Sequence, residues 1–209
     1  DVKILVYLRS QAQALESRYL QALKTGFQLP DFQTYVKRQI RNGRWNYQER
    51  LGRWSCFGKE NLVVRPYIRS LLPNEDILED FRITLGVPEN LWSALPLPKE
   101  RSQNLSIGPK SFAALNRIVF APDGLHRPSK KEMEKSAGEN LIDASDVSLT
   151  LNLDLGGVFR ELGWNNQKHT LLTTDVEQLC IDAFAESNAF VAREYLGSDE
   201  GLLFPVESK

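Results

Sequence analysis

An arginine and a serine near the start of the chain are the first residues that suggest a chemical role. Arg9 follows a run of apolar β-forming residues, 2–8, and Ser17 lies in the amphipathic segment after it. In open α/β sheets, ligands bind at the carboxyl ends of strands and near helix N-termini. A guanidinium group there suits phosphate, and a nearby hydroxyl can contact the same anion. The alternative is a surface arginine and a solvent-facing serine, and the pair alone leaves both interpretations open.

The hydrophobic pattern predicts the elements that would position this pair. Residues 2–8 are almost continuously apolar, as in a strand of a parallel sheet buried on both faces, and residues 61–67 form a second such strand. Helices are predicted over residues 11–25 and from Pro30. A third is predicted from the N-cap Asn46 to Gly58, with Trp54 and Phe57 on its apolar side. A fourth is predicted from the N-cap Asn74 to Gly86, and its buried side chains would be Ile77, Leu78, Phe81 and Leu85. This order predicts an α/β fold with a parallel sheet flanked by helices.

The second half of the chain is predicted to be helix-rich, within one domain over residues 1–209. Pro109 begins a short helix, residues 121–150 form a polar surface insertion, and residues 171–204 form a long helix with a tail. That helix is capped by Thr173 or Thr174 and ends at Gly197. Because the chain opens directly at Asp1 with a strand of the buried type, we expect native sequence upstream, so that the fold is N-terminally incomplete.

The bulk composition favours a soluble, cytoplasmic protein. The net charge is −1 over 209 residues, which gives no general attraction to nucleic acid, and no apolar run is long enough for a membrane span. No secretion signal is visible. The two cysteines, Cys56 and Cys180, are far apart and are predicted to be buried free thiols.

Several segments resemble the sulfotransferases that use 3'-phosphoadenosine 5'-phosphosulfate. Residues 6–11 and 15–19 resemble the 3'-phosphate-binding strand and helix of that family. Residues 47–61 resemble the helix before the next strand, and residues 63–67 resemble the strand whose terminal tyrosine approaches the adenine. Asp80-Phe81 and Leu85–Val87 match the helix after it, and Asn104–Ser106 resembles a short motif of the group. The likeness is greatest to bacterial proteins, some associated with carbohydrate sulfation, and it covers residues 1–90 well and 171–204 more loosely.

The resemblance implies a P-loop-NTPase-like sulfotransferase fold, with residues 1–90 as the nucleotide-binding core. It implies that Arg9 and Ser17 bind the 3'-phosphate and that Tyr67 contacts the adenine, while Arg65 lies near them without an assigned role. The implied activity is transfer of a sulfuryl group from the nucleotide to an acceptor hydroxyl, expected on a carbohydrate, with no metal. The alternative is a non-catalytic module of this fold that binds a glycan or a protein; a nucleotide kinase is disfavoured.

The chain departs from the family in its donor loop and its catalytic base. The family's 5'-phosphosulfate loop precedes the strand that residues 2–8 match, and these 209 residues contain neither a Gly-rich phosphate loop nor a GxxxxGK[ST] motif. We therefore expect part of the active site to lie outside this chain. The two histidines, His126 and His169, are interpreted as surface or capping residues, so no catalytic base is assigned.

A basic stretch from Lys37 to Arg69 bears on the acceptor. It holds nine Lys or Arg against two Glu, an excess of seven positive charges, whereas the rest of the chain carries −8. Trp45, Tyr47 and Trp54 are interleaved. One interpretation is a cleft edge for an anionic or sugar acceptor, and the other is a solvated helix face with Trp54 in the core. Single-stranded nucleic acid is disfavoured, because the stretch is short and carries no RNA-binding motif.

Overall fold

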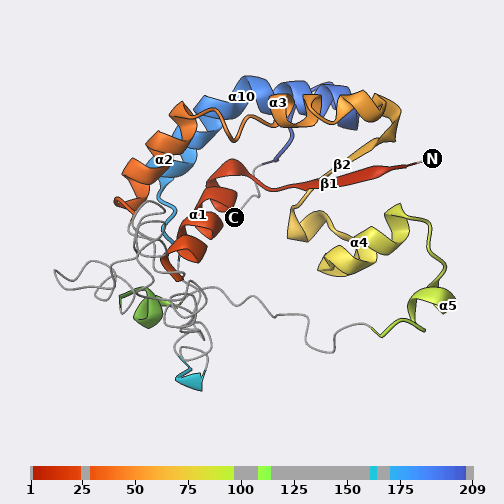
Figure 1. Ribbon diagram of the computed structural model, residues 1–209, viewed down its shortest axis with the longest axis horizontal. Helices are drawn as coiled ribbons and strands as arrows, with labels where there is room; N and C mark the ends of the chain where they lie inside the picture. Colours follow the sequence, from red (N-terminus) through yellow and green to blue (C-terminus); the bar gives the residue numbers. More distant parts are fainter. Residues whose placement is uncertain (1, 25–28, 97–107, 114–160, 164–169, 206–209) are drawn as a thin grey trace, which may run out of the picture. The chain divides into compact units, whose positions relative to one another are not determined.

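A computed structural model describes residues 2–24, 29–96, 108–113, 161–163 and 170–205 (Figure 1). The chain divides into two compact units. The first consists of Asp1–Ala14, Val36–Gln103 and Leu172–Lys209, and the second of Leu15–Tyr35 and Asn104–Leu171. The predicted insertion 121–150, His126 and His169 lie outside the described residues.

The first unit contains the parallel sheet that the sequence predicts. Strand β1 (Ile4–Leu8) pairs in parallel with β2 (Leu62–Pro66), in a register that places Ile4 opposite Leu62 and Leu8 opposite Pro66. These two strands make up the whole sheet within the described residues. A parallel pair needs a crossover connection, which here includes helices α2 (Phe32–Arg41) and α3 (Tyr47–Gly52). The mixed α/β class is therefore confirmed.

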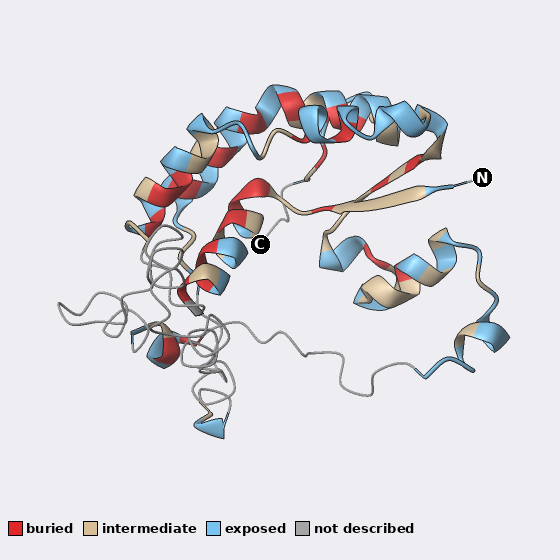
Figure 2. Ribbon diagram, in the orientation of Figure 1, coloured by how far each residue is buried: buried red, intermediate tan, exposed pale blue. Residues whose placement is uncertain are grey.

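One face of the sheet packs against α3 and the long helix α10 (Thr174–Leu196), which lie side by side (Figure 1). Side chains alternate between the faces of a strand, so Val6 and Leu8 of β1 point the same way as Val64 of β2. The core formed there is apolar and includes Leu8, Tyr47, Leu51, Val64, Val191, Ala192 and Leu203. Figure 2 shows the buried positions spaced along α10, in keeping with an amphipathic helix lying on a core.

The opposite face of the sheet is polar at its centre. Tyr7 and Arg65, which are partners in the register, both reach Asp80 of α4 (Ile77–Thr84). The Tyr7 hydroxyl donates to Asp80 Oδ2 at 2.6 Å, and Arg65 Nε donates to the same atom at 3.1 Å, while Arg65 Nη2 forms an ion pair with Oδ1. Asp80 is only 1% exposed, so a buried carboxylate links α4 to the sheet.

Two details predicted for α4 are wrong. Its N-cap is Asp76, whose side chain accepts a hydrogen bond from Leu78 N at 2.9 Å, and Asn74 lies in the preceding turn with a φ of 54°. Of the side chains expected to be buried, Phe81 and Leu85 are exposed. The helix is rotated toward Asp80 because satisfying that carboxylate outweighs burying the apolar side chains.

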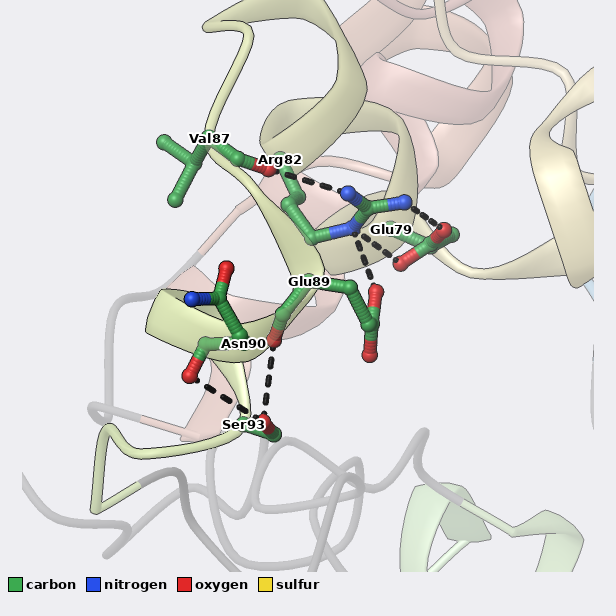
Figure 3. Close-up of polar contacts among 6 residues, drawn as sticks. All are labelled: Glu79, Arg82, Val87, Glu89, Asn90 and Ser93. Carbon is green, nitrogen blue, oxygen red and sulfur yellow. Dashed lines mark hydrogen bonds and ion pairs between the residues drawn. The ribbon is translucent and has the colours of Figure 1, made fainter.

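Arg82 connects α4 to the short helix α5 (Glu89–Trp92), as Figure 3 shows. Its guanidinium group donates to both carboxylate oxygens of Glu79, at 2.6 and 2.9 Å, and to the carbonyl of Val87 at 2.9 Å. Nε also lies 3.1 Å from a carboxylate oxygen of Glu89. One side chain thereby holds the turn between the two helices.

Helix α3 is shorter than the sequence predicts. Asn46 caps it as expected, accepting a hydrogen bond from Glu49 N at 3.1 Å, but the α-helix ends at Gly52. A 3-10 turn, η1 (Ser55–Phe57), follows, and Gly58 ends it with a φ of 91°. Trp54 therefore turns away from the core and is exposed, contrary to the interpretation that placed it inside, and Cys56 is exposed rather than buried.

The second unit is described chiefly by the end of α1 (Gln11–Lys24) and the start of α2. Tyr19 of α1 packs against the rings of Phe32 and Tyr35, with 5.2 Å between centroids in both pairs. Its hydroxyl donates to the carbonyl of Pro30 at 3.0 Å. The predicted helices 11–25 and from Pro30 are thus confirmed over their described parts.

The long C-terminal helix agrees with the sequence. Thr173 is its N-cap, Gly197 ends it in the left-handed conformation with a φ of 65°, and Cys180 is buried as expected. Residues 109–113 are helical, in keeping with the start predicted at Pro109. None of the helices in the described ranges is both long enough and apolar enough to cross a lipid bilayer.

Candidate functional site

Arg9 lies at the carboxyl end of β1, where the sequence places it, and is half-buried. Its Nε donates to Oε1 of Gln13, one turn along α1, at 3.0 Å. Its backbone carbonyl accepts a hydrogen bond from the Tyr47 hydroxyl at 2.6 Å. No acidic side chain among the described residues forms an ion pair with Arg9, so its charge is available to an anionic ligand.

Tyr47 is the residue that fixes the backbone of Arg9. Its ring lies in the core beneath the sheet, and burial raises the pKa of Tyr47 to about 12, although the charges of Arg50 and Arg9 oppose the shift. The hydroxyl therefore keeps its proton at every ordinary pH and donates to the carbonyl without interruption. The orientation of the Arg9 backbone is set by α3 as well as by β1.

Tyr47→Phe is expected to lower the free energy of unfolding by about 1–3 kcal/mol, because the partly buried Arg9 carbonyl loses its donor. Urea denaturation followed by circular dichroism measures the change. Tyr195→Phe, at a half-buried tyrosine of α10, is the control and should change stability by less than about 0.5 kcal/mol. Equal effects in the two variants would contradict the role of the hydroxyl.

Tyr67 follows β2 and lies at the same end of the sheet as Arg9. Its backbone N–H donates to the carbonyl of Leu8 at 2.6 Å, which extends the strand pairing by one residue. The structure therefore brings Arg9 and Tyr67 together, on consecutive strands of one parallel sheet. Tyr67 is half-buried, and the adenine contact that the family resemblance implies for it stays a prediction.

Ser17, the third residue predicted for the site, is exposed on α1 and belongs to the second unit. Arg9 and Tyr67, in contrast, both belong to the first unit. Its contact with a phosphate therefore also remains a prediction.

Arg65 is near the predicted site in sequence but has another partner. It holds Asp80, and the Tyr7 hydroxyl does the same from β1. Burial by itself raises the pKa of Asp80, but the hydrogen bonds from Arg65 and Tyr7 and the charge of Arg65 lower it more, so the net pKa lies below its ordinary value. Burial, with the neighbouring carboxylate, raises the pKa of Tyr7 to about 12. Both groups are therefore structural at neutral pH, with Asp80 ionised and Tyr7 protonated.

A pair of amides that sequence reasoning missed supports the start of α1. Gln11, the first residue of α1, is buried and exchanges two hydrogen bonds with Asn188 of α10, at 2.7 and 3.1 Å. The adjacent Ser187 accepts from Gln48 N at 3.1 Å and donates to Asn46 Oδ1 at 2.9 Å. The signal available in the sequence was the presence of the polar Ser187 and Asn188 on an otherwise apolar face of α10. Together they fix the N-termini of α1 and α3 beside Arg9.

The arrangement suits an anion more than a metal ion. No group of three or more His, Cys, Asp or Glu that could hold a metal occurs in the part of the chain that the structure describes. Arg9 offers guanidinium donors at the end of the sheet that also carries Tyr67, in a frame fixed by Tyr47, Gln11 and Asn188. A guanidinium group beside an aromatic ring can contact a phosphate and an attached base.

Comparison with known proteins leaves the family open. No family model matches the chain, and no solved structure matches it. The chain is 27% identical over 208 residues to an uncharacterized protein of Archaeoglobus fulgidus, an alignment that covers 98% of this chain and 49% of the archaeal protein. It thus spans about half the length of that relative.

Proposed function

We propose that this chain is the nucleotide-binding part of a sulfotransferase with a P-loop-NTPase-like fold. The observation that carries the proposal is the position of Arg9, which has no acidic partner among the described residues and lies beside Tyr67 at the carboxyl end of two parallel strands. The sequence resemblance assigns these two residues to the 3'-phosphate and the adenine of the sulfuryl donor. Ser17 is the further proposed phosphate contact.

In the proposed reaction, an acceptor hydroxyl oxygen forms a bond to the donor's sulfur while the sulfur–oxygen bond to the nucleotide's 5'-phosphate breaks. The hydroxyl proton goes to a base that is not assigned here, and the other product is 3'-phosphoadenosine 5'-phosphate. Catalysis of this kind depends on positioning and on stabilisation of the transferring anion's charge. Arg9 and Tyr67 would supply positioning of the nucleotide, and the proposed acceptor is a carbohydrate.

Titration calorimetry with 3'-phosphoadenosine 5'-phosphate tests the donor site in the full-length protein. Arg9→Ala is expected to weaken binding by about ten- to a hundredfold, because a charge-assisted contact contributes about 1.5–3 kcal/mol. Ser17→Ala, which removes a neutral donor, should weaken it less. Arg41→Ala, at an exposed arginine at the end of α2, is the control and should leave the affinity unchanged.

Two results would overturn the assignment. One is a full-length protein that does not bind the nucleotide, and the other is an Arg9→Ala variant that binds as tightly as the wild type. In either case the second candidate becomes the better one, namely a non-catalytic module of the same fold that binds a glycan or a protein. That candidate is favoured by exposed aromatic and arginine side chains on α3 and η1.

A further inference from the structure

A hollow of about 380 Å³ lies at the end of α3 and along η1, away from the core. It is lined by Arg50, Arg53, Trp54 and Phe57, all of which are exposed. About half the surface of Trp54 (49%) and of Phe57 (55%) is in contact with solvent. Large aromatic side chains grouped in this way on a surface indicate a binding site more often than scattered ones do.

The turn that carries the aromatic wall of the hollow is held by hydrogen bonds. The rings of Trp54 and Phe57 are 6.2 Å apart, with 32° between their planes. The turn that carries them is closed by Ser55 Oγ donating to the carbonyl of Gly52 and by Asn61 Nδ2 donating to that of Phe57, each at 2.7 Å. The backbone that presents the two rings is therefore ordered before any ligand arrives.

One of the two arginines of the hollow, Arg50, is also positioned. The guanidinium carbon of Arg50 lies 5.9 Å from the centre of the Trp45 ring, and Trp45 Nε1 donates to Gln39 Oε1 at 3.3 Å. Neither Arg50 nor Arg53 takes part in an ion pair with any residue that the structure describes. Two unneutralised guanidinium groups thus face a hollow with an aromatic wall.

We propose that this hollow binds an anionic sugar unit, a uronate or a sulfated residue of an oligosaccharide. Its volume is at the lower end of the roughly 300–1,000 Å³ of small-molecule sites, which suits one or two sugar rings. An arginine fork matches a carboxylate or sulfate group, and an indole ring packs against the apolar face of a sugar.

Single-stranded nucleic acid fits the same surface less well. It requires a groove that follows several phosphates with successive stacking rings, whereas this is one hollow with two lining cations. The sugar assignment does not depend on the nucleotide donor. In a sulfotransferase the bound sugar would be the acceptor or its neighbouring unit, and in a non-catalytic module it would be the ligand. Failure of the sugar proposal and failure of the nucleotide proposal are therefore measured separately.

The test is titration of the full-length protein, without nucleotide, with digalacturonate, a sulfated chondroitin disaccharide and neutral galactobiose. We expect at least one anionic disaccharide to bind, galactobiose to bind at least about tenfold more weakly, and both Trp54→Ala and Arg53→Gln to weaken binding by about fivefold or more. Arg44→Gln is the matched control, because it removes an exposed charge of the same basic stretch that does not line the hollow, and should change affinity less than about twofold.

Each opposite outcome overturns the proposal. These outcomes are no saturable binding of either anionic disaccharide, equal weakening by Arg44→Gln and Arg53→Gln, and tighter binding of a short oligothymidylate than of any sugar. Thermal unfolding of every variant shows whether a loss of binding reflects a loss of fold. Because both replaced side chains are exposed, we expect the variants to unfold at the temperature of the wild type.

Discussion

Replacement of Leu203 by alanine is expected to lower the free energy of unfolding by about 2–5 kcal/mol. Leu203 lies beyond the end of α10, in the tail, yet it is 2% exposed and belongs to the core with Leu8, Val64 and Val191. Alanine would leave a cavity between the sheet and α10 that the neighbouring side chains fill only in part. Urea denaturation of the variant and the wild type measures the difference.

The adjacent residue supplies the control for this prediction. Leu202 has the same side chain and immediately precedes Leu203, but it is exposed. Leu202→Ala should therefore change stability by less than about 0.5 kcal/mol. Similar losses in the two variants would mean that the tail does not complete the core.

The second large effect is expected at Asp80. Asp80→Ala removes the carboxylate that accepts from both Arg65 and Tyr7. Both donors on the sheet then lose this partner. Breaking a buried ion pair by removing one partner costs about 3–5 kcal/mol, and solvent reduces this because the Arg65 side chain is 40% exposed. We expect a loss of about 2–3 kcal/mol at pH 7, whereas Asp199→Asn, at an exposed carboxylate, should have little effect.

The contribution of Asp80 should also depend on pH in one direction. Its pKa in the folded protein is lowered, so the ionised form is favoured by folding. The stabilisation is complete above the unfolded pKa, near 4, and is lost as the pH falls through the lower folded value. The difference between wild type and Asp80→Asn, measured by urea denaturation, should therefore shrink below about pH 4. A difference that grows in acid would contradict an ionised Asp80.

The strands and most helix ends were predictable because their signals are local. Continuous apolar β-formers identified β1 and β2, and Asn46, Thr173 and Gly197 marked helix ends through caps and backbone conformations that depend on neighbouring residues alone. The buried side of α4 was predicted wrongly, since a hydrophobic pattern assigns a carboxylate to solvent, and Asp80 is buried by partners on other elements.

The candidate site shows the same division. Arg9 and Tyr67 could be expected at one edge because the carboxyl ends of parallel strands meet there. The partners of Tyr47, Gln11 and Asn188 were not predictable, because a polar residue on an apolar helix face indicates a buried hydrogen bond but does not show which residue, as many as 177 positions away, is bonded to it. The helical spacing of Trp54 left the core and a cleft edge both open, and the end of α3 at Gly52 explains why the ring is at the surface.

The distance along the chain between Gln11 and Asn188 also determines when the first unit can fold. During synthesis β1 leaves the ribosome long before α10 and Leu203, which cover it, have been made. Closing so long a loop carries an entropy cost before its contacts form, and domains of high contact order fold slowly. The apolar face of β1 therefore stays uncovered until α10 and Leu203 have been synthesised, and the first unit completes its core only then.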